Sequence, residues 1–536
     1  MNGHIINSFC SLAFLGAFVP ATALIYTLSP QRVRPWVLLL ASYACFWLIS
    51  GKLLVLLIAT TLVTYLTGLV LGRVRAEQRE AVAGTRDRAE RRAIKARYRN
   101  RSRMVVGFSA LASVGILVSV KYLGFLGGIA SSLGTLVGFE WHLVPPKIGV
   151  PIGISFYTLQ ALSYVFDVYR STIEPERNPM RLALFMGFFP QLMEGPICRY
   201  GETADQLAAG EPIRTDNLVN GLVRIAWGVA KIIIVADRLN LYVKPVFADY
   251  TAWSGTVIAL GAVLYTFQLY CDFSGTIDIV IGVGRIFGVR LPENFRQPFF
   301  SRTASEFWQR WHITLGAWLR DYVFYPVSLS SPVKRFARGA RKVFGTRTGS
   351  VLSGGVALFC VWILNGLWHG SGWQYLFFGM YYFVTILASG LLEPLFSGMR
   401  RALKIDPSAR PWIVFQVLRT WTIVFVGELI FRAEGVRAGI GMLGRIASGF
   451  SPAALIDGSV LAPGMDAADF AVVALFAVAM LFFGLWRELG CRTPRPALQH
   501  RIGISCAALA AICVVIIVFG AYGQGYVPLD PIYAQF

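Results

Sequence analysis

Long apolar runs alternate with short polar segments along most of the chain. A helix needs about 20 mainly apolar residues, at about 1.5 Å of rise each, to cross the hydrocarbon core of a membrane. Runs that approach or reach this length are Ser8–Leu28, Val33–Ser50, Lys52–Leu71, Met104–Val120, Leu218–Ala236, Val351–Trp368, Trp373–Leu392, Trp412–Ile430, Phe470–Leu485 and Ile504–Gly520. Between 122 and 300, shorter runs form either full spans or re-entrant pieces. The pattern predicts an all-α polytopic membrane protein with about ten to twelve transmembrane helices plus re-entrant or interfacial helices.

We expect one integral membrane domain with three successive parts. Residues 1–120 hold N-terminal transmembrane helices and a basic cytoplasmic loop at 73–103. Residues 121–400 form a central core, and residues 401–536 hold the C-terminal helices. The first apolar run lacks a basic N-terminal region, which argues against a cleaved signal peptide.

Composition agrees with a membrane protein. Of the 536 residues, 55% are hydrophobic and 15% are charged, and the mean hydropathy is +0.58. Soluble domains average about 45–50% apolar and about 25% charged residues. These values exclude a disordered protein and argue against a soluble multi-domain enzyme. The eight cysteines form no C-x-x-C pair, and most lie inside apolar runs as small buried hydrophobes.

Positive charge is concentrated between the apolar runs. The formal net charge is +21, which in a soluble protein would indicate nucleic-acid binding. Here Arg73–Arg103 holds 12 Lys or Arg against four acids, and Lys334–Arg347 holds six and no acid. Arg400–Arg410 and Arg487–Arg501 are smaller basic stretches. Because cytoplasmic loops collect Lys and Arg, we place all four inside and both termini outside. Nucleic acid is therefore not an expected partner, whereas anionic membrane lipid beside 73–103 is.

His369 is the first candidate for chemistry, because an ionisable group between two apolar runs is costly to bury. Asn365 lies four residues before it and faces the same way if the helix continues. The flanking glycines allow a backbone or ligand to approach closely. A neutral imidazole can act as general base on a hydroxyl. The alternative is a buried structural histidine bonded to Asn365 or to a backbone carbonyl.

His312 is the second candidate. Thr303 and Glu306 form a capping-box pattern, which predicts a helix that begins there. Apolar residues at three- and four-residue spacing then predict an amphipathic helix at the membrane interface. These residues are Trp308, Trp311, Leu315, Trp318 and Tyr322. His312 borders this stripe and is placed to point into a cavity.

A third polar cluster lies between 268 and 285. Its candidates for substrate binding are Tyr270, Asp272, Ser274 and Asp278. Asp278 and Arg285 are seven residues apart, so they share a helix face and can pair. The alternative is polar contact between spans without a catalytic role. The glycine spacing does not fit a dinucleotide fingerprint, and no hydrolase, kinase or metal-ligand motif accompanies the two histidines.

Several stretches together resemble the membrane-bound O-acyltransferase (MBOAT) family. The alginate O-acetyltransferase branch is the nearer one, and the teichoic-acid D-alanyltransferase type is more distant. The matching stretches are Pro151–Gln160, Phe189–Tyr200, Tyr270–Asp278, Arg290–Arg296, Phe307–Tyr325, Gly366–Gly370 and Ile532–Phe536.

The resemblance implies a ring of helices around a central funnel, with His369 as the catalytic histidine at its floor and His312 beside it. It implies no bound cofactor: an acyl thioester, either acetyl-CoA or an acyl carrier protein, arrives from the cytoplasm as co-substrate. It also implies an extracytoplasmic partner that completes transfer to a polymer. Departures from the alginate-type pattern occur at 326–331, at Asn365 and at Glu194, and they leave the acceptor open.

We therefore predict an acyltransferase of a bacterial inner membrane. It moves a small acyl group, with acetyl favoured, to hydroxyls of a cell-surface or exported polysaccharide. Asn365, Trp311 or His312 would stabilise the oxyanion, and Trp368 would contact substrate. The rival interpretations are D-alanyl transfer from a carrier protein to teichoic acid, a transporter or flippase, and a non-enzymatic scaffold.

Overall fold

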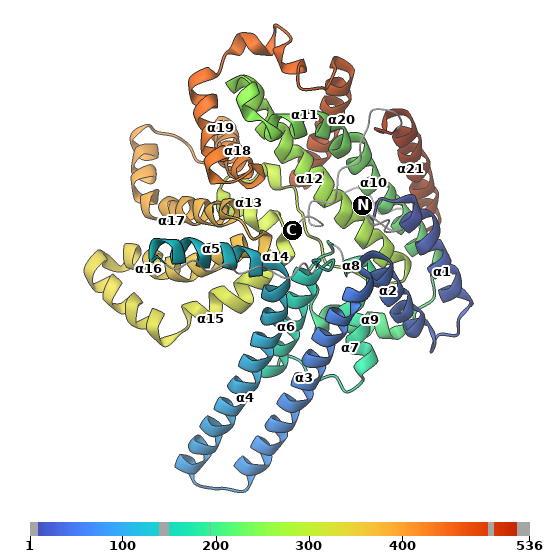
Figure 1. Ribbon diagram of the computed structural model, residues 1–536, viewed down its shortest axis with the longest axis vertical. Coiled ribbons are helices and arrows are strands. Elements are labelled where there is room, and N and C mark those ends of the chain that lie inside the picture. The colour runs from blue at the N-terminus through green and yellow to red at the C-terminus, as the bar shows by residue number, and fades with distance from the viewer. Residues whose placement is uncertain (1–8, 139–148, 193, 491–497, 523–536) are drawn as a thin grey trace. The chain divides into compact units, whose positions relative to one another are not determined.

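The computed structural model describes residues 9–138, 149–192, 194–490 and 498–522, and these residues form helices without a strand (Figure 1). Three features of the sequence prediction lie outside them: the first seven residues, the family-like ending Ile532–Phe536 and most of the tail after Gly520. Within the described residues the prediction of an all-α protein is confirmed.

Helices long and apolar enough to cross a membrane account for most of the predicted runs. Nine occur in the described part of the chain: Arg34–Ala83, Arg88–Leu136, Thr215–Ala248, Gly255–Ile286, Ser331–His369, Trp373–Ala402, Arg410–Arg432, Ala467–Glu488 and Ile502–Phe519. The first contains two predicted runs, which meet at a 3-10 turn over Gly51–Leu53. The apolar helix Ala13–Leu28 is shorter. The protein is thus a multi-pass membrane protein.

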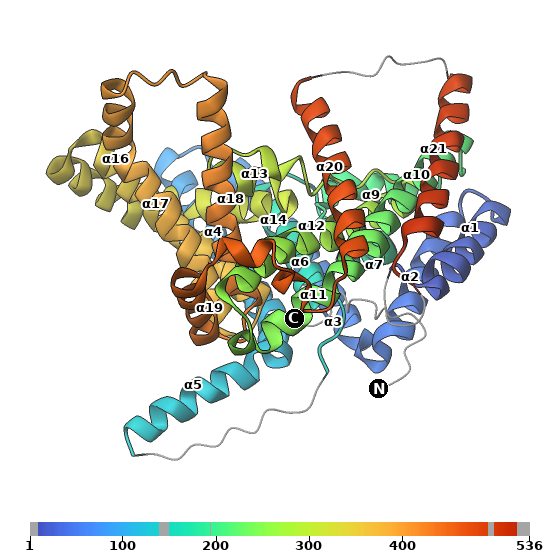
Figure 2. The same cartoon turned by 90° about the horizontal axis from the view of Figure 1, so that it is seen from above.

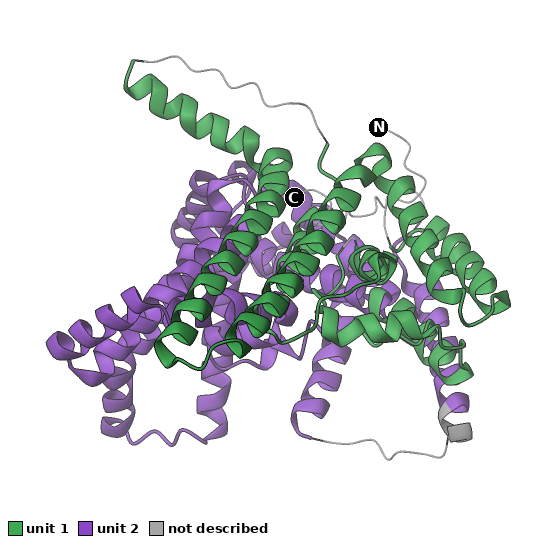
Figure 3. Ribbon diagram, turned by 90° about the horizontal axis from the view of Figure 1, so that it is seen from below, with its two compact units in different colours: residues 1–222, 280–292 green, residues 223–279, 293–536 purple. Residues whose placement is uncertain are grey.

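The chain forms two compact units (Figure 3). The first comprises residues 1–222 and 280–292, and the second comprises 223–279 and 293–536. The first unit contains α1 (Val19–Leu28), α2 (Arg34–Ser50), α3 (Leu54–Ala83), α4 (Arg88–Leu117), α5 (Leu123–Leu136), α6 (Ile154–Arg170), α7 (Pro179–Gly187), α8 (Phe189–Leu192) and α9 (Tyr200–Ala209). Two helices, α10 (Thr215–Ala230) and α12 (Gly255–Ile286), have residues in both units.

The remaining helices belong to the second unit. They are α11 (Asp237–Ala248), α13 (Ala304–Arg310), α14 (Ile313–Leu319), α15 (Tyr325–Ser328), α16 (Ser331–His369), α17 (Trp373–Ala402), α18 (Arg410–Arg432), α19 (Val436–Gly449), α20 (Ala467–Glu488) and α21 (Leu498–Phe519). In the described part of the chain, four π-helical turns interrupt or extend helices: Ala13–Phe18 and Val118–Tyr122 in the first unit, and Lys231–Ala236 and Arg320–Phe324 in the second.

In the first unit, α3 and α4 form a long antiparallel hairpin, and α6 packs against both (Figure 1). The basic segment 73–103, which connects two of the predicted runs, is largely helical. It forms the second half of α3, a short turn and the first half of α4. Asp87 caps α4, because its side chain accepts a hydrogen bond from the Glu90 amide at 2.9 Å. The high content of good helix formers explains why the charged segment stays ordered.

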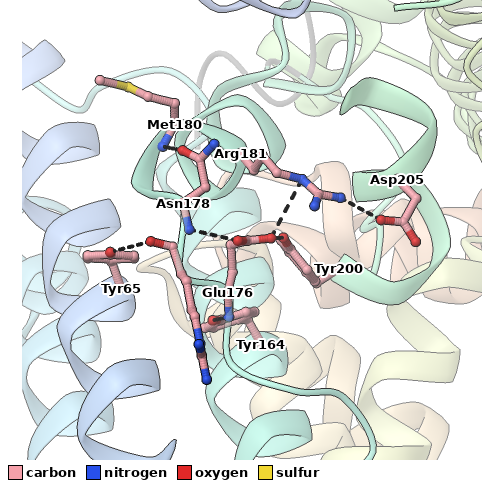
Figure 4. Close-up of polar contacts among 9 residues, drawn as sticks. Tyr65, Tyr164, Glu176, Asn178, Met180, Arg181, Tyr200 and Asp205 are labelled. Carbon is pink, nitrogen blue, oxygen red and sulfur yellow. Dashed lines mark hydrogen bonds and ion pairs between the residues drawn. The ribbon is translucent and has the colours of Figure 1, made fainter. Parts of the chain in front are cut away.

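The segment between α6 and α7 is held by a carboxylate network around Glu176 (Figure 4). The Asn178 amide donates to Glu176 Oε1 at 2.7 Å, and Tyr200 donates to Oε2. Arg181 Nε lies 3.6 Å from Glu176 Oε2, and its Nη2 lies 2.5 Å from Asp205. The Glu176 carboxylate therefore joins this segment to both α7 and α9.

In the second unit, α16 and α17 lie side by side (Figure 2). Their backbones touch, because a Cβ on Gly366 would lie 2.4 Å from the Tyr375 carbonyl oxygen. A Cβ on Gly379 would likewise lie 2.3 Å from the Trp362 carbonyl oxygen. Small residues let membrane helices approach this closely. The close approach that we predicted at the glycines is thus confirmed, with a backbone as the neighbour.

We expect Glu176→Gln to lower the free energy of unfolding by about 1–3 kcal/mol at neutral pH, because the buried Tyr200 hydroxyl and the Asn178 amide lose a charged acceptor. Burial acts to raise the pKa of Glu176, but hydrogen bonds from Tyr200 and the backbone, together with Arg181, outweigh burial and lower the pKa below its usual 4.5. A carboxyl with a lowered folded pKa stabilises the protein above its unfolded pKa, and this contribution is lost as the pH falls through the folded value.

Thermal unfolding in detergent, measured from pH 7 down to pH 3, checks this expectation. The difference between Glu176→Gln and the natural protein should narrow below about pH 4.5. Glu174→Gln is the control, because the Glu174 side chain is 77% exposed and surface pairs contribute about 0–1 kcal/mol. A difference that stays constant with pH would contradict the role of the carboxylate.

Candidate active site

His369 is the last residue of α16. The helix continues through Asn365 to His369, as predicted, and stops at Gly370, after which α17 begins at Trp373. Asn365 and His369 are each only 5% exposed. The Asn365 side-chain oxygen has no hydrogen-bond partner among the described residues. The junction of α16 and α17 thus buries an imidazole and an amide one helical turn apart.

His312 lies at a break between two helices. Thr303 caps α13 as predicted, since its hydroxyl oxygen accepts a hydrogen bond from the Glu306 amide at 3.1 Å. However, α13 ends at Arg310, and His312 has a left-handed backbone (φ 49°, ψ 49°). The prediction of one amphipathic helix through this region is therefore wrong.

The break is caused by a segment that the helical spacing does not reveal. Asn294 is fully buried, and its carbonyl oxygen accepts a hydrogen bond from the Ile313 amide at 3.0 Å. Its side-chain oxygen also accepts hydrogen bonds from the Thr314 amide and hydroxyl, both at 3.0 Å. These bonds hold the chain in an extended turn, and their number offsets the strain of a non-glycine residue at positive φ.

The predicted interfacial stripe is mostly inside the protein. Four of its members, Trp311, Leu315, Trp318 and Tyr322, are buried. Trp311 contacts Phe295 across the break, with ring centroids 5.1 Å apart. The apolar spacing therefore correctly predicted that these side chains are buried. It incorrectly predicted that a membrane interface, rather than the protein interior, surrounds them.

The break brings His312 next to His369. The two imidazole centroids are 6.4 Å apart, and the ring of Trp368 contacts both, at 5.3 Å from His312 and 4.9 Å from His369. His312 is 2% exposed. Burial lowers the pKa of His312 from 6.5 to about 3, so this imidazole is neutral at physiological pH. A neutral imidazole offers one N–H donor and one acceptor nitrogen.

Aromatic rings form the rest of the wall. The centroids of Phe431 and Phe378 lie 5.2 Å and 5.9 Å from that of His369. Phe273 lies 4.9 Å from His312 on the other side. Two polar rings are thus enclosed by apolar ones, an environment in which hydrogen bonds and developing charges interact more strongly than in water.

The third predicted cluster lies on α12. Tyr270, Ser274 and Asp278 occupy successive turns of one face and surround the buried Lys231. The Lys231 ammonium lies 2.5 Å from Asp278 Oδ2 and 2.9 Å from Ser274 Oγ, and 5.8 Å from the centre of the Tyr270 ring. Asp272 is also buried but lies on a different face of α12.

The cationic partners of Asp278 are Lys231 and Arg224. The sequence spacing had instead suggested Arg285. Arg224 Nη2 lies 2.8 Å from Asp278 and 2.6 Å from Glu293. The four charges sum to zero, so the cluster is satisfied within itself. This favours the interpretation of polar contact between helices for Ser274 and Asp278. Tyr270 also contacts Trp311, the residue before His312, with ring centroids 5.9 Å apart.

Sequence reasoning missed several buried charged residues. Lys231 interrupts the apolar run Leu218–Ala236, and Glu428 interrupts Trp412–Ile430. Both are nearly inaccessible, at 4% and 2% exposed. Their signal was available, because a charge inside a span is costly and needs a reason. Asn294 gave no such signal, since an asparagine in a connecting segment is ordinary.

Comparison with known proteins adds to this geometry. The model of the membrane-bound O-acyltransferase family matches residues 177–431. That range includes both histidines, Asn294 and the whole α12 cluster.

Known relatives cover most of the chain. A probable alginate O-acetylase of Pseudomonas aeruginosa is 32% identical over 80% of this chain and 72% of its own length. A peptidoglycan O-acetyltransferase of Helicobacter pylori is 26% identical over 62% of this chain and 63% of its own. A teichoic acid D-alanyltransferase of Bacillus subtilis is 28% identical over 55% of this chain and 71% of its own.

These similarities confirm the resemblance seen in the sequence motifs, with the alginate branch nearer than the teichoic-acid branch. They also agree with the all-helical, multi-pass structure. The chain therefore belongs to the membrane-bound O-acyltransferase family and is an acyltransferase that acts in a membrane.

Proposed function

We propose that the protein moves an acetyl group from a cytoplasmic thioester to hydroxyls of an exported or cell-surface polysaccharide, with His369 as the general base. One observation carries the proposal: two buried imidazoles, 6.4 Å apart, share one aromatic enclosure. Burying an ionisable imidazole among apolar rings costs free energy, which favours a functional role for it. It has the proton chemistry that a hydroxyl acceptor needs.

The transfer balances with these groups alone. His369 takes the proton of the acceptor hydroxyl while the hydroxyl oxygen attacks the thioester carbonyl carbon. The C–S bond then breaks, and the departing thiolate takes the proton from the imidazolium. The oxyanion that forms between these steps needs preorganised donors, each of which contributes about 10²–10³ in rate. Neutral His312, Trp311 and the Asn365 amide are the candidates.

The enclosure suits a small acyl group. Phe378, Phe431 and Trp368 surround His369 at ring distances of 4.9–5.9 Å. Such walls accept a methyl group, whereas a D-alanyl group would also bring an ammonium into the apolar enclosure, where it costs several kcal/mol unless paired. Acetyl is therefore our first proposal. D-alanyl transfer remains the second, because the Bacillus subtilis relative is named for it.

The acceptor and the orientation complete the proposal. The relatives are named for alginate, peptidoglycan and teichoic acid, all of which are polymers. We infer a polymer acceptor outside a bacterial inner membrane, with an extracytoplasmic partner protein that completes the transfer. The basic segments would lie in the cytoplasm and both termini outside, by the positive-inside tendency. Coenzyme A or a carrier-protein phosphopantetheine would then enter from the basic side.

The donor experiment separates the candidate functions. Purified protein is incubated with acetyl-CoA or with D-alanyl carrier protein, together with a polymer acceptor and the partner, and thiol release is measured. Consumption of acetyl-CoA supports acetyl transfer, and consumption of the carrier thioester supports the second proposal. If neither thioester is consumed, both donor assignments are wrong.

We expect His369→Ala to reduce thiol release by about 10²–10⁴ fold, because the general base is lost. His312→Ala should cost about 10²–10³ fold if His312 stabilises the oxyanion. Gln309→Ala is the control, since Gln309 is an exposed residue of α13. Unfolding temperatures are compared to confirm that the variants fold. Normal turnover by a folded His369→Ala protein would disprove the mechanism.

We expect Phe431→Leu or Phe431→Ala to widen the enclosure and shift acyl selectivity. Butyryl has two more methylenes than acetyl, and each is worth about 0.8 kcal/mol when buried, so the kcat/KM ratio of butyryl-CoA to acetyl-CoA should rise by about 10–15-fold. Phe359→Leu and Phe359→Ala are the matched controls, because Phe359 on α16 is 43% exposed. An unchanged ratio in folded Phe431 variants, or an equal rise in the controls, would show that this ring does not limit acyl size.

A further inference from the structure

A basic pocket lies in the first unit, where the α3–α4 hairpin meets the end of α6. Its volume is about 280 Å³. The lining residues are Leu71, Arg75, Gln78, Lys95, Arg99, Ser102, Val168, Tyr169 and Ser171. It thus combines three cationic side chains with hydroxyl and amide groups, and no carboxylate belongs to its lining.

The spacing along the two helices explains how the pocket forms. Leu71, Arg75 and Gln78 are four and three residues apart, so they share one face of α3. Lys95, Arg99 and Ser102 have the same spacing on α4. Since the two helices run antiparallel and side by side (Figure 1), the two rows lie alongside each other.

Two of the three positive charges in the pocket, those of Lys95 and Arg99, are not neutralised by a carboxylate of the described residues. Arg75 is held by a backbone hydrogen bond to the Val168 carbonyl and by an ion pair with the exposed Glu174 at 3.3 Å. Among the described residues, Lys95 and Arg99 have no carboxylate within ion-pair distance. The nearby Glu77 is paired with Arg101 at 2.5 Å. Lys95 and Arg99 lie one turn apart on α4, so their like charges repel each other, and a bound anion would reduce this repulsion.

The position of the pocket along α3 and α4, relative to the apolar runs, indicates which anion it meets. In α3 the apolar run ends at Leu71, and in α4 the apolar run begins at Met104. The pocket therefore starts at the edge of the apolar segments. It extends to Gln78, about 10 Å further along the helix axis at 1.5 Å per residue. The headgroup layer of a bilayer extends about 5–8 Å beyond the hydrocarbon core on each side. Arg75 and Arg99, four and five residues from these edges, lie about 6 and 7.5 Å out and therefore within this layer.

We propose that this pocket binds the phosphate of an anionic phospholipid headgroup. Arg99 provides a planar guanidinium that can donate two hydrogen bonds to phosphate, and Lys95 provides a point charge. Ser102, Ser171 and Gln78 supply neutral donors for the remaining phosphate or glycerol oxygens. The site goes beyond the proposed acyl transfer and does not depend on it.

The test uses the purified full-length protein in neutral detergent, titrated with phosphatidylglycerol and analysed by native mass spectrometry. We expect one tight phosphatidylglycerol site that phosphatidylcholine fills more weakly, because choline neutralises the phosphate. Arg99→Gln should weaken binding about fivefold, and Lys95→Gln combined with Arg99→Gln about 25-fold, at about fivefold per charge. Added salt should weaken binding as well.

Arg97→Gln is the matched control. Arg97 is an exposed arginine of the same helix, two residues from Arg99, and does not line the pocket. The affinity of the Arg97→Gln protein for phosphatidylglycerol should change less than twofold. Equal weakening by Arg97→Gln and Arg99→Gln would mean diffuse surface attraction and would overturn the proposal.

A second set of titrations uses inorganic pyrophosphate and coenzyme A. We expect neither to displace phosphatidylglycerol. If coenzyme A binds in an Arg99-dependent manner and phosphatidylglycerol does not bind, the pocket receives a soluble phosphate, and the lipid assignment is wrong. Because Lys95 and Arg99 are exposed, both variants are expected to fold, and equal unfolding temperatures check this.

Discussion

The hydrogen bonds from Asn294 to the start of α14 are the interaction on which the histidine pair depends. They convert a helix-forming stretch into two short helices and hold His312 in a left-handed conformation. Without the break, the imidazole would follow the helix that α13 began. With it, His312 packs against Trp368 and faces His369. A buried asparagine in a connecting segment thus sets the geometry of two residues far from it in sequence.

The same requirement to satisfy buried polar groups organises α12. Lys231 lies in a π-helical turn, which adds a residue to the helix and directs a cation toward Asp278 and Ser274. The crossing there is tight, since a Cβ on Gly228 would lie 2.4 Å from the Gly275 carbonyl oxygen. Close backbone contact places the charges within reach of each other. The arrangement explains why a lysine is tolerated in an apolar run.

The sequence predicted much of the fold because length and hydropathy define membrane helices directly. The runs around Val351–Trp368 and Trp373–Leu392 became α16 and α17, and His369 falls at their junction as expected. His312 was chosen correctly as a neighbour of His369 by resemblance, but its local structure was not. Helical periodicity describes contacts along one segment, whereas the break at His312 comes from residues 294–296. Lys231 and Glu428 could have been found from hydropathy alone.

The contact between α16 and α17 has a mechanical consequence. Their backbones meet at two levels, Gly366 against Tyr375 and Gly379 against Trp362, with no side chain between them. A hairpin joined in this way has no compressible layer that would let one helix slide along the other. In bilayers of different thickness it can adjust by tilting as one body, as transmembrane helices commonly do. The imidazole at its turn then changes depth with the hairpin and keeps its neighbours on α17.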